Sequence, residues 1–148
     1  MQAYATNEKA RYDYEILETF EAGLVLKGYE VKAIKNGKVS IRGAYVKILS
    51  NEAWILGANV SPYQPGNVPP DYDQQRNRKL LLKRSELKYL IGKSQEKGLT
   101  LVPLKLYNKN GLVKLEVGIG RGKKKHDKRA KIIERETKRK LARALKSK

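Results

Sequence analysis

Residues 100–107 (TLVPLKLY), 108–111 (NKNG) and 112–119 (LVKLEVGI) form the stretch of this 148-residue chain that decides its fold. The two outer runs are rich in leucine and valine, and an Asn-Gly pair between two such runs is a strong signal for a β-hairpin. Pro103 cannot donate a backbone hydrogen bond, so it indicates a sheet edge or a bulge. The stretch therefore predicts an antiparallel hairpin, around which the other elements are arranged.

Further short strands precede this hairpin. Residues 14–26 mix β-branched and aromatic residues with acids and predict a strand, in which Gly23 indicates a bulge or a barrel bend. Alternating patterns predict more strands at residues 39–41, 44–49 and 53–56. Residues 59–70 hold four of the five prolines and therefore predict an irregular loop.

Short helices are expected between the strands. Asn7 is a favoured N-cap and starts a helix that ends near Asp13. Residues 30–35 have the spacing of a helix with one apolar face, and Ser85 can cap a third helix over residues 86–97. Together these patterns predict a mainly β fold, an OB-like antiparallel β-barrel with two or three short α-helices. A single-layer α+β sandwich is the alternative.

Lysine and arginine are concentrated at the C-terminal end. Residues 121–148 hold 14 of the 33 Lys and Arg but only three of the 15 acids, so they carry +11 of the net charge of +18. A nucleic-acid backbone is the simplest anionic partner for such a segment. We therefore expect an RNA-binding domain at residues 1–120 and a basic tail at 121–148.

The tail is expected to be disordered when free, because like charges repel and little apolar surface offsets the cost of ordering. A thin apolar stripe and acid-first i,i+4 pairs run along it, the first pair being Asp127 and Lys131. Neutralisation of the excess positive charge by phosphates predicts that it becomes helical on binding.

The composition excludes several kinds of chemistry. The chain has no Cys and a single His, His126, so it cannot form disulfides, thiolate metal sites or a triad around a fixed histidine. We expect no metal and no cofactor. Residues 118–123 (GIGRGK) have the wrong spacing for a phosphate-binding loop. Their glycines are expected to let the chain leave the last strand of the barrel.

A membrane partner is less favoured than a nucleic acid. No stretch approaches the roughly 20 apolar residues of a membrane span, and residues 1–6 lack the features of a signal peptide, so we expect a cytoplasmic protein. The most basic segment has no Trp or Phe to anchor it in a lipid surface. Of the nine tyrosines, at most two or three are expected to stack on bases.

Several strings, in collinear order over almost the whole chain, match a known family. They are residues 7–12, 20–23, 26–32, Pro62-Tyr63 with Gly66-Asn67, 76–82, 98–104 and 122–129. With these strings the chain resembles the small protein B family, the tmRNA-binding proteins of bacterial trans-translation. The resemblance implies an OB-type barrel whose tail is unstructured in the free protein. It also implies binding to the tRNA-like domain of tmRNA near its elbow, in place of the missing anticodon arm.

The resemblance further implies an adaptor that is not an enzyme. The tmRNA complex, with an elongation GTPase, enters ribosomes stalled on messages without a stop codon, and the tail occupies the mRNA channel beside the decoding centre of the small subunit. No membrane is involved, and we expect a monomer. Two alternatives stay open: a basic ribosomal structural or assembly protein bound to rRNA, and an RNA-modifying enzyme, for which the sequence offers no catalytic constellation.

The site residues are carried over from the family position by position. The RNA-binding set is Asn7, Glu21, Leu81, Lys83, Lys114, Arg121, Lys123 and Lys124. The tail residues expected to act on the ribosome are His126, Asp127, Lys128 and Arg129. Without the resemblance, Glu21 would be interpreted as a surface acid of a strand and Leu81 as a core residue. The chain departs from the usual family pattern at Glu8, Ala33, Lys35 and in residues 69–75, whose path stays open.

Overall fold

The computed structural model describes residues 2–123, so most of the predicted tail, including its proposed disorder and its helix, lies outside the described residues. The strands are β1 (Ala3–Thr6), β2 (Tyr14–Leu24), β3 (Val39–Ser40), β4 (Tyr45–Leu49), β5 (Glu52–Leu56), β6 (Asn59–Val60), β7 (Arg78–Leu81), β8 (Leu99–Lys109) and β9 (Leu112–Gly122). The helices are α1 (Glu8–Asp13), α2 (Gly28–Lys35), α3 (Arg84–Ser94) and the 3₁₀ turn η1 (Pro65–Asn67). Within residues 2–123, no helix combines the length and the apolar character needed to cross a membrane.

The predicted hairpin is formed by β8 and β9, two strands of 11 residues each. Asn110 and Gly111 make its two-residue turn, with φ angles of 51° and 82°. This left-handed backbone is the one that an Asn-Gly pair adopts at least cost. The ladder is irregular between Pro103 and Lys105, where proline has no amide hydrogen to donate. The predicted hairpin and the predicted irregularity at Pro103 are both confirmed.

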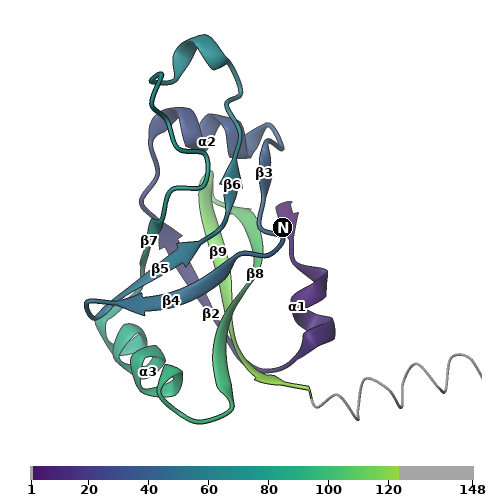
Figure 1. The fold of residues 1–148 in the computed structure, drawn as a ribbon, viewed down its shortest axis with the longest axis vertical. Helices are drawn as coiled ribbons and strands as arrows, with labels where there is room; N and C mark the ends of the chain where they lie inside the picture. The colour runs from purple at the N-terminus through teal and green to yellow at the C-terminus, as the bar shows by residue number, and fades with distance from the viewer. Residues whose placement is uncertain (1, 124–148) are drawn as a thin grey trace, which may run out of the picture.

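Seven antiparallel strands form one sheet in the order β1-β8-β9-β2-β7-β5-β4, and β3 pairs with β6 in a separate short ladder. β9 is bonded to β8 on one edge and to β2 on the other (Figure 1). β4, the last strand, curls back beside β8, and a cavity of about 270 Å³ lies between them. Among the described residues no backbone ladder joins these two strands. The predicted OB-like barrel with three flanking helices is thus confirmed in an incompletely closed form.

The interior of the barrel is aliphatic. Ile55, Leu115 and Ile119 are each at most 1% exposed, and burying a side chain of this size contributes about 1.5–3 kcal/mol. α2 and α3 pack against this core through Ile34 and Leu90, which are also buried. The helices therefore cover openings of the barrel and leave most of its outer sheet face free.

α3 begins and ends earlier than the sequence predicted. It spans Arg84–Ser94 rather than residues 86–97, and its N-cap is Lys83 rather than Ser85. The Glu86 carboxylate accepts a hydrogen bond from the Lys83 N–H at 3.3 Å. An acid at the third helical position thus satisfies the end of the helix, and its charge suits the positive end of the helix dipole.

α1 packs on the outer face of the sheet (Figure 1). Asn7 caps this helix as predicted, because its side-chain oxygen accepts a hydrogen bond from the Ala10 N–H at 3.3 Å. Below the helix lies a second buried cluster made of Ala10, Val102 and Leu104, with Tyr14 and Ile16 packed against it. Among residues 2–123, α1 therefore covers the outer face of the sheet at one end.

The glycines at 118 and 120 make room for this cluster. The prediction that they let the chain leave its last strand is wrong, because β9 continues to Gly122. A Cβ atom on Gly118 would lie 2.9 Å from Leu104 Cδ1, and one on Gly120 would lie 3.0 Å from Tyr14 Cβ. Both glycines allow β9 to approach side chains that pack under α1.

We predict that Gly118→Ala destabilises the fold. The added methyl group must displace the buried Leu104 side chain, and overpacking of this kind costs about 1–3 kcal/mol. The free energy of unfolding, measured by urea denaturation of the full chain, checks this. Gly122→Ala in the same strand is the matched control, because nothing lies within 4 Å of its added Cβ. Equal stabilities of the two variants would contradict the packing argument.

Candidate nucleic-acid interface

Three of the predicted RNA-binding residues meet on the open part of the outer sheet face. Gly23 of β2 pairs with Leu81 of β7 on one side and with Lys114 of β9 on the other. A Cβ atom on Gly23 would lie 3.4 Å from Leu81 Cβ and 3.7 Å from Lys114 Nζ. Glu21 shares this face, because alternate residues of a strand point the same way. We call Glu21, Leu81 and Lys114 the outer sheet surface.

Two alternatives raised by the sequence are now decided. Leu81 is 51% exposed, so it is not a core residue and offers an apolar contact at the surface. Gly23 pairs on both sides, while the irregularity in the β2 ladder lies between Ile16 and Glu18. The interpretation of Gly23 as a bulge is therefore wrong. Its small size instead lets Leu81 and Lys114 approach each other across β2.

Glu21 is held as a carboxylate by its neighbours. It accepts a hydrogen bond from the Tyr107 hydroxyl at 2.7 Å and from Lys109 Nζ at 3.1 Å. The bond from Tyr107, followed by that from Lys109, lowers the pKa of Glu21. Burial and the same bond raise the pKa of Tyr107. Glu21 thus presents acceptor oxygens that can accept hydrogen bonds from the amino groups of bases.

A second carboxylate lies directly opposite the first. Glu116 of β9 is the cross-strand partner of Glu21, and two acids at such positions repel. Glu116 is neutralised by Arg11 at 3.0 Å and by Lys105 at 3.8 Å. Among the ion pairs within residues 2–123, none includes Lys114, so its ammonium group is available to a phosphate.

The sequence interpretation did not single out Tyr107, Lys109 or Lys105. All three lie in β8 at alternate positions, and after the irregularity at Pro103 they follow the period of two expected for one face of a strand. That alternation was visible in the sequence. What was not visible is that β9 brings this face beside Glu21, because the pairing joins residues more than 80 positions apart.

The remaining predicted residues lie elsewhere. Lys83 is exposed and follows β7 by two residues, near the Leu81 end of the outer sheet surface. Arg121 pairs with Glu15 at the far end of β9, seven residues and roughly 23 Å from Lys114 along the strand. The next described cation, Lys123, donates from its backbone to Asp13 O at 3.0 Å and from Nζ to Arg11 O at 3.2 Å. Lys124 and residues 126–129 lie outside the described residues.

Asn7 is occupied within the protein. Its side chain is buried, accepts from Ala10 and donates from Nδ2 to Pro103 O at 2.9 Å. These bonds fix α1 to β8 beside the irregular part of that strand. The structure therefore shows Asn7 as a residue that positions α1, and a direct contact with RNA stays a prediction.

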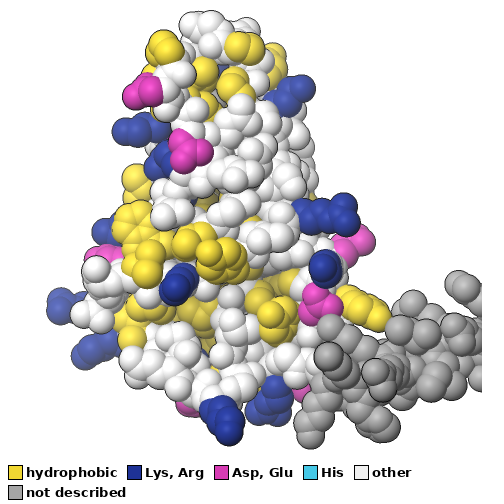
Figure 2. Space-filling view, viewed as in Figure 1, with side chains coloured by type: hydrophobic (Ala, Val, Ile, Leu, Met, Phe, Trp, Pro, Cys, Tyr) yellow, Lys and Arg dark blue, Asp and Glu magenta, His cyan; other side chains and the backbone are white. Residues whose placement is uncertain are grey.

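Net charge alone does not locate the interface. On the face drawn in Figure 2, Lys and Arg side chains are scattered among apolar and acidic ones. In the part of the chain that the structure describes, no group of three or more His, Cys, Asp or Glu side chains is placed to hold a metal ion. The outer sheet surface is instead distinguished by its mixture of an acceptor carboxylate, an exposed leucine and an available lysine.

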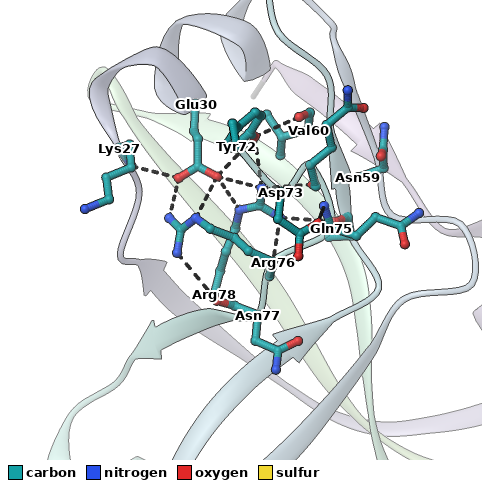
Figure 3. Close-up of polar contacts among 12 residues, drawn as sticks. Lys27, Glu30, Asn59, Val60, Tyr72, Asp73, Gln75, Arg76, Asn77 and Arg78 are labelled. Carbon is teal, nitrogen blue, oxygen red and sulfur yellow. Dashed lines mark hydrogen bonds and ion pairs between the residues drawn. The ribbon is translucent and has the colours of Figure 1, made fainter. Parts of the chain in front are cut away.

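A buried ionic network fixes the loop that leads into β7 (Figure 3). Glu30 of α2 is fully buried and binds both Arg76 and Arg78, with Arg78 Nε 2.7 Å from its Oε2 atom. The Tyr72 hydroxyl and the Lys27 N–H also contact this carboxylate, at 3.3 Å and 2.8 Å. Although burial opposes it, these bonds lower the pKa of Glu30, and the bond from Arg76 contributes most.

The inward direction of these arginines was not foreseen from the sequence. Arg78 is 1% exposed and donates to the backbone carbonyls of Ala58 and Gln74 at 3.1 Å and 3.0 Å. The signal was the period of two in β7, which places Arg78 on the same face as the buried Leu80. The network answers the open question of residues 69–75, because it anchors the end of that loop to α2.

An incompletely closed, OB-like antiparallel barrel in a chain with a net charge of +18 is typical of small nucleic-acid-binding proteins. The family model described as SmpB protein matches residues 4–147. The chain therefore belongs to the SmpB family.

Similar proteins span nearly the same length. An SsrA-binding protein of Thermosynechococcus vestitus is 49% identical over 146 residues, covering 99% of this chain and 96% of the relative. One of Acetivibrio thermocellus is 51% identical over 142 residues, covering 96% and 92%. A solved structure described as "tmRNA-SmpB: a journey to the center of the bacterial ribosome" contains a chain with 47% identity and a TM-score of 0.66, with 81% of this chain and 84% of that chain covered.

We predict that Glu30→Gln lowers the free energy of unfolding by about 3–5 kcal/mol, because Arg78 would stay buried without its counter-charge. The folded-state pKa of Glu30 lies below its ordinary value of 4.5. The stability that Glu30 contributes is therefore fully present above pH 4.5 and is lost as the pH falls through the folded-state pKa. Chemical denaturation between pH 3 and 7 checks this, because carboxylates titrate within that range.

The matched control is Glu96→Gln, which removes a half-exposed acid paired with Lys93 at 3.1 Å. An exposed pair of this kind contributes about 0–1 kcal/mol. A Glu30→Gln variant as stable as this control at neutral pH would show that the buried network does not hold the loop.

Proposed function

We propose that this chain binds the tRNA-like domain of tmRNA through the outer sheet surface and delivers tmRNA to stalled ribosomes in trans-translation. The observation that carries the proposal is the meeting of Glu21, Leu81 and Lys114 around Gly23 in a member of the SmpB family. Relatives named as SsrA-binding proteins support the choice of RNA.

The three residues supply different kinds of contact. Lys114 offers a point charge to a phosphate, which positions the RNA without reading its sequence. Glu21 accepts hydrogen bonds from base amino groups, and Leu81 packs against an exposed base or sugar. Lys83 adds a second phosphate contact near Leu81. A folded RNA with splayed bases at its elbow fits this combination better than a regular duplex, whose deep groove hides the base edges.

The basic tail supplies a second, separate contact. Residues 121–148 carry +11, and we place the part of this tail that follows β9 in the mRNA channel beside the decoding centre of the small subunit, where His126, Asp127, Lys128 and Arg129 act. An elongation GTPase accompanies the complex through tmRNA. The protein acts by binding, catalyses no reaction and works in the cytoplasm, where ribosomes are found. Co-sedimentation with stalled ribosomes only, rather than with all ribosomes, separates this role from that of a ribosomal structural protein.

Lys114→Ala is expected to weaken binding to the isolated tRNA-like domain at every salt concentration tested. The loss of one phosphate contact should reduce the slope of log affinity against log salt by about 1. Fluorescence anisotropy with a labelled tRNA-like domain measures both quantities. Lys88→Ala, which removes an exposed lysine of α3, is the matched control and should leave both nearly unchanged. Identical affinities and slopes for the two variants would remove Lys114 from the interface.

A chain that ends at Lys123 is expected to keep most of its affinity for the tRNA-like domain but to lose ribosome rescue. This end point retains the bond from the Lys123 N–H to Asp13 O, so β9 keeps its described contacts. Binding is measured as above, and rescue by the tagging of a protein translated from a message without a stop codon. Loss of RNA binding in parallel with rescue would show that the tail is the main RNA anchor.

A further inference from the structure

A pocket of about 590 Å³ lies between α2 and the turn η1. Figure 1 shows the end of the barrel at which α2 and the loop after β6 lie. This volume falls within the range of roughly 300–1,000 Å³ that is typical of small-ligand sites. The pocket shares no residue with the outer sheet surface. The side chains used in the argument are Tyr29, Lys32 and Lys35 of α2 and Tyr63, Gln64 and Asn67 of the loop.

Two strings singled out in the sequence line this pocket without having a role in the proposed function. The string 26–32 contributes Gly28, Tyr29, Val31 and Lys32 to the lining, and the string Pro62-Tyr63 with Gly66-Asn67 contributes Tyr63 and Asn67. They are separated by about 30 residues in the chain. The structure brings the two strings together because Glu30 binds the loop after β6 through Tyr72. Glu30 follows Tyr29 directly in α2, so the loop is held beside the pocket residues of this helix.

The pocket is held by rigid contacts beneath it. The Tyr72 hydroxyl contacts Glu30 and donates to Val60 O at 2.8 Å, which ties the loop to α2. The Tyr72 ring meets the Tyr29 ring edge-on, with 5.2 Å between centroids. The α2 wall of the pocket is therefore held in place by the buried ionic network that Figure 3 shows. A ligand would find this wall already formed, which reduces the cost of binding.

The lining is positive and aromatic. It includes Lys32 and Lys35 and no acidic residue. The Lys35 ammonium donates to Gly111 O at 2.7 Å, while Lys32 takes part in none of the ion pairs within residues 2–123. Tyr63 is 40% exposed. A cation beside an exposed aromatic ring suits a phosphate joined to a flat base.

Side-chain amides complete the chemistry. The Asn67 amide nitrogen donates to the side-chain oxygen of Gln64, which leaves the Asn67 oxygen as an acceptor and the Gln64 nitrogen as a donor. Such a pair can meet the edge of a base that also has both donors and acceptors. A purely apolar ligand would leave these groups unpaired, and an acidic peptide would not use the exposed ring.

We propose that this pocket binds one unpaired nucleotide of an RNA strand. The base stacks on Tyr63, its edge meets the Gln64 and Asn67 amides, and its phosphate lies at Lys32. The site is additional to the outer sheet surface and gives the protein a second place at which RNA is held. It requires a single-stranded segment, because a paired base has to leave its stack before it can enter a pocket.

The test uses the full chain and a pentauridine RNA whose central base is 4-thiouridine. Irradiation crosslinks the central base to the residue it touches, and mass spectrometry of the digested protein identifies that residue. We expect crosslinks at Tyr63 or Tyr29. Tyr63→Ala should raise the RNA concentration for half-maximal crosslinking in the pocket by about 5- to 150-fold, the range for loss of one stacked base. Lys32→Gln should raise the same concentration, because a phosphate contact is lost.

Matched variants separate stacking from loss of structure. Tyr63→Phe keeps the ring and should crosslink like the unchanged chain. Tyr45→Ala removes a tyrosine of β4 that is 50% exposed, and Lys88→Gln removes an exposed lysine of α3. Neither should change crosslinking in the pocket.

Crosslinks confined to the tail or to the outer sheet surface would overturn the proposal, as would an unchanged concentration dependence in Tyr63→Ala. The result is independent of the proposed function. Lys114→Ala is expected to lose affinity for the tRNA-like domain and to keep the pocket crosslink, so failure of one proposal is distinguishable from failure of the other.

Discussion

The strand β9 is hydrogen-bonded along both edges, and this constraint determines where every part of the outer face lies. A slip of one residue would move Leu115 and Val117 out of the core and Glu116 into it, so the register cannot change without loss of the barrel. The same strand carries Gly118 where α1 packs and Lys114 where the face is open. One strand thus separates the covered part of the sheet from the part available to a ligand.

The buried carboxylate of Glu30 has a comparable effect on the other side of the barrel. Residues 61–77 contain only the short η1 turn, and loops of this length without regular structure need an anchor to hold one conformation. Arg76 and Arg78 provide it by binding one carboxylate from α2. Buried ion pairs add little net stability compared with apolar packing. We therefore infer that the network serves mainly to select one loop path, in which Tyr63 faces α2 across the pocket.

Local patterns predicted what depends on neighbours in the chain. The hairpin turn, the cap at Asn7 and the irregularity at Pro103 follow from chemistry within a few residues, and each is confirmed. Local patterns failed where residues far apart in the chain determine the role of a residue. The role of Gly118 depends on Leu104 across a ladder, and the meeting of Glu21 with Tyr107 depends on strand order. The site residues themselves came from family resemblance, since no local rule distinguishes an RNA-binding leucine from a core leucine.

The charges of the body and of the tail suit different tasks. A tail with a net charge of +11 attracts any polyanion, so it contributes affinity and fast association but little choice of partner. Selectivity requires a feature that penalises wrong partners. Glu21 and Glu116 lie opposite each other on the neighbouring strands β2 and β9. Tyr107 donates a hydrogen bond that keeps Glu21 ionised, and Arg11 neutralises the charge of Glu116. At the proposed interface, a phosphate docked over Glu21 would be repelled, whereas a base amino group there would find a hydrogen-bond acceptor. The proposed role of Glu21 therefore assigns selectivity for RNA to a surface acid of a basic protein.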